Sequence, residues 1–165
     1  MRVVYLNDLQ TLLLDIWAWG LVHFSTGYLI HKVPARRLSN DGWLFKARAF
    51  EDDGRLYQRR FRIMRWKDKL PEAGAMFAGG ISKQSLIGVD DDGLSRFAIE
   101  TRRAELTHWL AALPGPLFVL WNPGHAVPLM ILYGVGVNAP FIMIQRFNRQ
   151  RIGRILERRA ARTVH

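Results

Sequence analysis

The segment Leu9–Ile30 reads LQTLLLDIWAWGLVHFSTGYLI and decides the fold class. As an α-helix its 22 residues would extend roughly 30 Å, which is the thickness of the hydrocarbon core of a bilayer. A soluble amphipathic helix would carry more polar residues along one face, whereas Asp15 and His23 are the main interruptions here. We therefore predict a transmembrane helix over residues 9–30, with Trp17, Trp19 and Tyr28 as its interface anchors.

A second apolar region lies in the last third of the chain. A helix is predicted from Leu94 toward Ala112, and the 19 residues of Ala126–Ile144 contain one strongly polar side chain, Asn138. The intervening segment Trp109–Trp121 is apolar but short for a complete span. Two arrangements remain open: three membrane spans, or one span plus a hairpin that dips into the membrane from the cytoplasmic side.

Between the apolar regions lies a polar insert, residues 32–95. Two aromatic-rich runs with partial alternation, Trp43–Phe50 and Arg55–Trp66, flank an Asp53-Gly54 pair. Such a pair between alternating runs is typical of a β-hairpin. We predict a cytoplasmic β-hairpin within the insert, and further loops at Gly79–Gly80 and at Asp90–Gly93.

The distribution of charge predicts the orientation in the membrane. The net charge is +10; residues 32–107 hold 16 Lys and Arg and the tail from Arg146 holds seven, whereas the N-terminus holds one. By the positive-inside rule the protein lies in the cell membrane, with the N-terminus outside and the bulk and C-terminus cytoplasmic. The basic tail, residues 146–165, is predicted to be an amphipathic helix on anionic lipid head groups, and no nucleic-acid-binding motif is found.

These segments define a predicted mainly α integral membrane protein with two to three transmembrane or hairpin helices. The single membrane domain 1–165 comprises a transmembrane helix (9–30), a cytoplasmic insert (32–95), a helix with a membrane hairpin or two spans (96–145), and a basic tail helix (146–165). The chain contains no cysteine, which excludes disulfides, thiolate metal sites and a cysteine acyl-enzyme.

The block Glu100–Trp109, ETRRAELTHW, holds the densest set of reactive side chains. On a helix Arg102, Glu105 and His108 form a slanting row, and Glu100 pairs with Arg103 at i, i+3. A carboxylate beside an imidazole can orient it for proton transfer, and an arginine can bind an oxyanion. The alternative is a set of helix-surface ion pairs that ends in an interfacial His-Trp anchor.

Three amides at the end of the second apolar region form another candidate set. Asn138 and Gln145 are seven residues apart and share a helix face, and Asn148 lies one turn further. Amides in an apolar helix need partners, which are either sugar hydroxyls or the Glu/His row. The alternative is that they join neighbouring helices.

The ionisable residues of the first predicted span are further candidates. Side chains such as Asp15 and His23 are costly in a membrane unless they are paired or used. Asp15 can also serve as a structural ion-pair partner, and His23 as a hydrogen-bonded packing residue. No spacing of histidines and carboxylates indicates a metal site, so no metal and no cofactor are predicted.

Three blocks resemble the glycosyl-4,4'-diaponeurosporenoate acyltransferase family, small bacterial membrane proteins of staphyloxanthin-type carotenoid synthesis. They are Arg65–Pro71, Glu100–Trp109, and Asn138–Pro140 followed by Gln145–Arg149. Their order, the chain length and the basic tail also match, so the resemblance covers nearly the whole chain. The chain departs from the expected pattern at Phe147, where tyrosine is expected, and at Gln150, where proline is expected.

The resemblance implies transfer of a fatty acyl group to a sugar hydroxyl of a membrane glycolipid. We assign His108 as general base, Glu105 as its orienter, and Arg102 or Arg103 as binder of an anionic donor group or oxyanion. The remaining assigned residues are Glu100 in the catalytic set and Asn138, Gln145, Asn148 and Arg149 in the acceptor pocket.

The expected acyl donor is acyl-CoA, which would reach the basic cytoplasmic face. Direct attack by the sugar hydroxyl is simpler than an acyl-enzyme, although Ser25 or Ser82 can approach His108 in space. The competing hypothesis is a non-catalytic accessory or lipid-binding subunit that docks on a membrane-protein partner.

Overall fold

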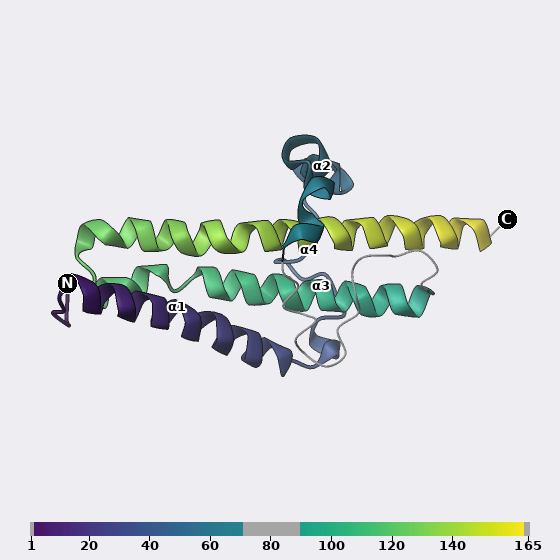
Figure 1. Ribbon diagram of the computed structural model, residues 1–165. Helices are drawn as coiled ribbons and strands as arrows, with labels where there is room; N and C mark the ends of the chain where they lie inside the picture. Colours follow the sequence, from purple (N-terminus) through teal and green to yellow (C-terminus); the bar gives the residue numbers. More distant parts are fainter. Residues whose placement is uncertain (1, 71–89, 164–165) are drawn as a thin grey trace. The chain divides into compact units, whose positions relative to one another are not determined.

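The computed structural model describes residues 2–70 and 90–163 (Figure 1). Within these ranges the regular structure is helical and no strand is present. The α-helices are α1 (Asp8–His31), α2 (Arg55–Phe61), α3 (Asp91–Ala112) and α4 (Val127–Thr163). The mainly α fold is confirmed. The predicted loop at Gly79–Gly80, and Ser82, lie outside the described residues. The loop predicted at Asp90–Gly93 is wrong, because α3 begins at Asp91 and the Asp90 side chain accepts a hydrogen bond from the Gly93 amide in its first turn.

The chain divides into two compact units. Unit 1 comprises Met1–Val33 and Glu105–Ile142, and unit 2 comprises Pro34–Ala104 and Met143–His165. The helices α3 and α4 therefore each contribute residues to both units. The prediction of one membrane domain over residues 1–165 stays a prediction.

Helix α1 of unit 1 matches the predicted helix over residues 9–30. Asn7 caps its N-terminus: its side chain accepts a hydrogen bond from the Gln10 amide (2.9 Å), and the Gln10 side chain accepts one from the Asn7 amide (3.2 Å). This reciprocal pair satisfies two of the backbone donors that a helix start leaves open. The helix ends at His31, before Pro34.

The core of unit 1 is built around Trp19 of α1. Its indole stacks on Phe118 of the short helix η6 (Gly115–Leu120), with ring centroids 4.7 Å apart, and contacts Tyr133 of α4 at 5.0 Å. Trp19 is only 6% exposed, so it is a core residue and its predicted role as an interface anchor is wrong. Aromatic packing of this kind fixes α1 against η6 and the first half of α4.

Gly134 of α4 allows this close approach. A Cβ atom there would lie 2.7 Å from Trp19 Cη2 and 3.0 Å from the Ala112 carbonyl oxygen, whereas a Cβ at Gly136 would meet nothing within 4 Å. We expect Gly134→Ala to destabilise the protein by about 1–3 kcal/mol through overpacking. Gly136→Ala, the matched control two residues away, should instead stabilise it by about 0.5–1 kcal/mol. Thermal unfolding in detergent distinguishes the two, and equal Tm values would contradict the packing described.

A buried polar cluster joins α1 to the loop before α4. Asp15 Oδ1 accepts hydrogen bonds from Trp121 Nε1 and from Asn122 Nδ2, both at 2.7 Å. Arg2 adds a bond from its Nε to the Trp121 carbonyl at 2.8 Å. Asp15 therefore has the structural role that the sequence left open, with indole and amide partners instead of an arginine.

The packing of unit 2 falls into two apolar clusters. One joins Tyr57 and Ile63 of the insert to Ile144 and Phe147 of α4. The other joins α3 to the tail half of α4; its buried members are Leu94, Phe97 and Ile152. Because α4 continues through Gln150, its apolar face serves both clusters. A proline at position 150 would interrupt this helix.

The predicted β-hairpin is wrong. The second run forms α2, and the first lies in turns followed by the short helix η2 (Ala49–Gly54). The Asp53-Gly54 signal does mark a turn, since both residues have positive φ (51° and 84°), but the turn leads into a helix. The partial alternation of apolar and polar residues in the two runs therefore did not predict the secondary structure of the insert. A buried contact of Glu51 with Arg146, 95 residues away, holds the insert instead.

One helix in the described part of the chain is long and apolar enough to cross a membrane. It is the helical stretch Gly124–Thr163, with a mean hydropathy of 1.8 over its most apolar window. Helix α1 does not reach that measure, because side chains such as Asp15 and His23 lower its mean hydropathy. The predicted number of two to three spans therefore stays a prediction.

Candidate active site

The end of α3 places His108 beside α4 within unit 1. His108 Nδ1 lies 2.9 Å from Asn138 Oδ1, and the imidazole stacks on Phe141 with centroids 4.6 Å apart and planes at 10°. Asn138 is fully buried, and its Nδ2 donates to the Gly134 carbonyl at 2.8 Å. Of the two partners considered for Asn138, the Glu/His row is the one that it contacts.

These contacts define which imidazole nitrogen can take up a proton. Because Asn138 Nδ2 donates to the Gly134 carbonyl, Asn138 Oδ1 must be the acceptor toward His108. His108 Nδ1 therefore carries its hydrogen and donates, which leaves Nε2 as the basic nitrogen. A hydrogen bond at one ring nitrogen fixes the tautomer and orientation of an imidazole.

Glu105 lies one turn before His108 and is fully buried. Its Oε1 accepts a hydrogen bond from Trp109 Nε1 at 3.2 Å. A buried carboxylate is stable only with hydrogen-bond or ion-pair partners. The partner of His108 Nδ1 is Asn138. The orienting role predicted for Glu105 stays a prediction.

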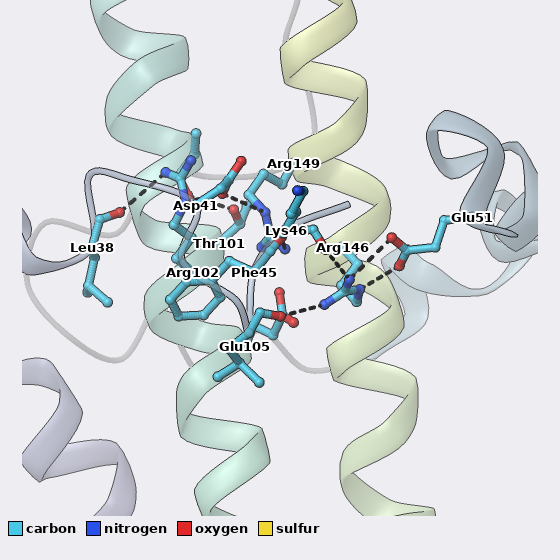
Figure 2. Close-up of polar contacts among 12 residues, drawn as sticks. Leu38, Asp41, Phe45, Lys46, Glu51, Thr101, Arg102, Glu105, Arg146 and Arg149 are labelled. Carbon is cyan, nitrogen blue, oxygen red and sulfur yellow. Dashed lines mark hydrogen bonds and ion pairs between the residues drawn. The ribbon is translucent and has the colours of Figure 1, made fainter. Parts of the chain in front are cut away.

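In unit 2 the predicted arginines Arg102 and Arg149 lie close to a carboxylate that the sequence did not single out. Arg102 Nε lies 2.7 Å from Asp41 Oδ1, and Arg149 Nε lies 3.7 Å from the same atom. Arg102 also donates to the Leu38 carbonyl (3.3 Å), and Arg149 to the Phe45 carbonyl (2.8 Å). Figure 2 shows both guanidinium groups turned toward Asp41. These contacts anchor the start of the insert to α3 and α4.

Glu100 and Arg103 form the helix-surface pair that their spacing predicted. Arg103 Nε lies 3.1 Å from Glu100 Oε2, and the Glu100 side chain is 41% exposed. The remaining members of the predicted acceptor pocket, Gln145 and Asn148, are buried on α4 within unit 2. The structure thus brings His108 and Asn138 together in unit 1, and Arg102 and Arg149 together in unit 2.

A second buried carboxylate, Glu51, forms the densest polar network of unit 2. It is 1% exposed and accepts hydrogen bonds from Arg146 Nε (2.6 Å), from the Tyr57 hydroxyl and from the Arg48 amide. Arg146 also donates to the Leu44 and Lys46 carbonyls, each at 3.0 Å (Figure 2). These bonds of Arg146 hold the insert against α4.

The network fixes the charge of its members. Burial alone would raise the pKa of Glu51, but hydrogen bonds from Arg146, Tyr57 and the Arg48 amide outweigh it and hold that pKa below the usual 4.5. Burial and the Glu51 carboxylate raise the pKa of Tyr57 far above its usual value, so Tyr57 remains a neutral donor. The group is a structural ion pair at neutral pH.

Sequence reasoning missed Asp41, Glu51 and Tyr57. The available signal was the position of Arg146 and Arg149 at the end of an apolar helix, where a cation requires a counter-ion. The sequence offered several acidic residues in the insert, and nothing in their spacing distinguished Asp41 and Glu51 from the neighbouring Asp52 and Asp53.

Comparison with known proteins identifies the class and then the family. Residues 41–158 match the model of the family described as glycosyl-4,4'-diaponeurosporenoate acyltransferase. Proteins of that name from Staphylococcus aureus strains RF122 / ET3-1, MRSA252 and N315 are each 30% identical over 149 residues, which is 87% of this chain and 88% of theirs. No solved structure matches.

The protein is therefore an enzyme of the acyltransferase class. It belongs to the glycosyl-4,4'-diaponeurosporenoate acyltransferase family, as its sequence blocks indicated.

Proposed function

We propose that this enzyme transfers a fatty acyl group to a sugar hydroxyl of a membrane glycolipid, of which glycosyl carotenoids are one kind. Its relatives are named as acyltransferases of glycosyl-4,4'-diaponeurosporenoate. The single observation that carries the chemistry is the His108–Asn138 hydrogen bond, because it leaves His108 Nε2 as a base at a defined position.

In the proposed reaction the sugar hydroxyl attacks the acyl carbonyl carbon while His108 Nε2 accepts the hydroxyl proton. The carbon–sulfur bond of a thioester donor such as acyl-CoA then breaks, and the thiol leaves with the proton from His108. No cysteine is available for an acyl-enzyme. Glu105 would support His108, and Arg102 or Arg103 would face the anionic parts of the donor.

The apolar surface of unit 1 supports a membrane location for the acceptor. Large apolar side chains of α1 and of the first half of α4 are exposed, including Trp17 (76%), Phe24 (72%) and Leu132 (67%). Such extensive apolar exposure on adjacent helices suits contact with lipid. We propose a cell-membrane enzyme with its N-terminus outside and with the bulk and C-terminus, including the basic tail, on the cytoplasmic side.

The function is tested by supplying both substrates to the purified enzyme in lipid. We expect labelled acyl-CoA and a glycosyl carotenoid to give an acylated glycolipid and one equivalent of free thiol. Transfer by the wild-type chain that requires the sugar hydroxyl supports the proposal. If no acyl-CoA donor and no glycolipid acceptor gives transfer, and a stoichiometric protein partner is present in the preparation, the result would favour the accessory-subunit hypothesis. The family match does not favour that hypothesis.

A further inference from the structure

The segment Arg59–Arg65 of unit 2 forms a surface that combines arginines with apolar side chains. It comprises the end of α2 and the short helix η3 (Ile63–Arg65). Six of its seven residues are exposed, and the exception, Ile63, is fully buried. Phe61 is 48% exposed and Met64 is 46% exposed. Ile63 therefore anchors the segment in the core while its neighbours remain outside.

Three of the four arginines in this segment carry a charge that no described carboxylate balances. Arg59 pairs with Asp52 at 2.9 Å. Arg60, Arg62 and Arg65 form no ion pair within the described part of the chain. Exposed cations beside exposed apolar side chains are typical of segments that lie on an anionic lipid surface.

Arg62 occupies a backbone position at which glycine is usual. Its φ of +48° places it in the left-handed region at the C-terminal end of α2, where its amide donates to the Gln58 carbonyl at 3.1 Å. A residue with a side chain adopts this conformation only at a cost in free energy. Arg62 adds this strain without forming an ion pair in return, as a residue used for binding would.

The insert packs on α4 where that helix changes from apolar to basic. The cluster that holds Ile63 includes Ile144 and Phe147 of α4. The preceding stretch Ala126–Ile144 has one strongly polar side chain, whereas positions 146 to 154 contain four arginines. In a helix that crosses a membrane such a change marks the level of the lipid head groups. The Arg59–Arg65 segment is attached to α4 at this level.

We propose that the Arg59–Arg65 segment docks on the anionic surface of the bilayer. Its three arginines without an ion pair contact lipid phosphates, and Phe61 and Met64 enter the region between head groups and acyl chains. An acidic protein or a soluble polyanion would match the charge alone. A bilayer also accounts for the apolar side chains and for the position on α4. The inference rests on the membrane location proposed above but not on acyl transfer.

The absence of cysteine from the chain allows a single label to report docking. The full chain with Met64→Cys, carrying an environment-sensitive fluorophore, is placed in phosphatidylcholine nanodiscs with or without phosphatidylglycerol. A lipid with a spin label on its head group is included as a quencher. We expect strong quenching in the anionic discs, and weak quenching in neutral discs or at about 1 M salt, which screens the charges.

Two substitutions at Arg62 separate its charge from its effect on the fold. In the labelled chain Arg62→Gly should lower the ratio of docked to undocked protein about fivefold, the effect of one arginine near an anionic surface. Its Tm should be unchanged or higher, because glycine relieves the left-handed strain. Arg62→Lys, the matched control, keeps the charge and should change the ratio by less than about twofold.

Three results would overturn the docking surface: equal quenching in neutral and anionic discs, no quenching in either, or docking by Arg62→Gly as tight as that of the labelled parent. The second is the result expected if an acidic protein or a soluble polyanion occupies the segment. Failure of the proposed function is distinguishable. A chain that docks but transfers no acyl group removes the acyl-transfer proposal alone, whereas a chain that enters neither kind of disc removes the membrane location together with the docking surface.

Discussion

Replacement of His108 by alanine is expected to lower kcat for acyl transfer by about 10²- to 10⁴-fold, the range found when a general base is removed. His108 Nδ1 lies 2.9 Å from Asn138 Oδ1, so in the proposed mechanism Nε2 takes the hydroxyl proton. Removal of the base should leave the KM for either substrate nearly unchanged. Transfer from labelled acyl-CoA to a glycolipid in vesicles measures both constants.

Asn138 provides a sharper test of the same geometry, because it acts through His108. Asn138→Leu removes the oxygen that holds Nδ1–H and should lower kcat about a hundredfold, whereas Asn138→Asp keeps an acceptor and should recover most of that loss. A purely structural role would give equal kcat values for the two variants after correction for folded protein. Undiminished transfer by His108→Ala would rule out the proposed mechanism, whatever the Asn138 variants do.

The parts of this protein that the sequence predicted depend on local chemistry. Residues 9–30 and 94–112 are long runs with helical spacing, and the structure extends them by only a few residues, to Asp8–His31 and Asp91–Ala112. Asn138 was recognised because an amide inside an apolar helix needs a partner. The structure adds the identity of that partner, His108.

The parts that the sequence did not predict depend on contacts between distant residues. The segment around Asp53-Gly54 is helical, and Glu51 beside it accepts a hydrogen bond from Arg146 of α4, 95 residues away. Alternation along the chain carries no information about such a pair. The same is true of Asp41, whose contact with Arg102 spans 61 residues. Long-range ion pairs are therefore where local pattern reasoning fails in this chain.

The largest expected effect on stability is that of Glu51→Gln. The substitution nearly preserves shape but removes the carboxylate with which Arg146, a residue that is only 8% exposed, forms a buried ion pair. Breaking a buried pair in this way costs about 3–5 kcal/mol. Glu100→Gln breaks the ion pair with Arg103 on the surface of α3 and should cost less than about 1 kcal/mol. Denaturant unfolding in detergent, followed by circular dichroism, compares the two.

The pH dependence of unfolding gives an independent readout of the same pair. Because the pKa of Glu51 is lowered in the folded protein, its contribution is complete above the unfolded value of about 4.5 and is lost as the pH falls through the lower folded value. Wild-type stability should therefore decrease below about pH 4.5 more steeply than that of Glu51→Gln, which has no carboxylate to protonate at this position. Parallel curves for the two chains would show that Glu51 is not held as a buried carboxylate by Arg146, Tyr57 and the Arg48 amide.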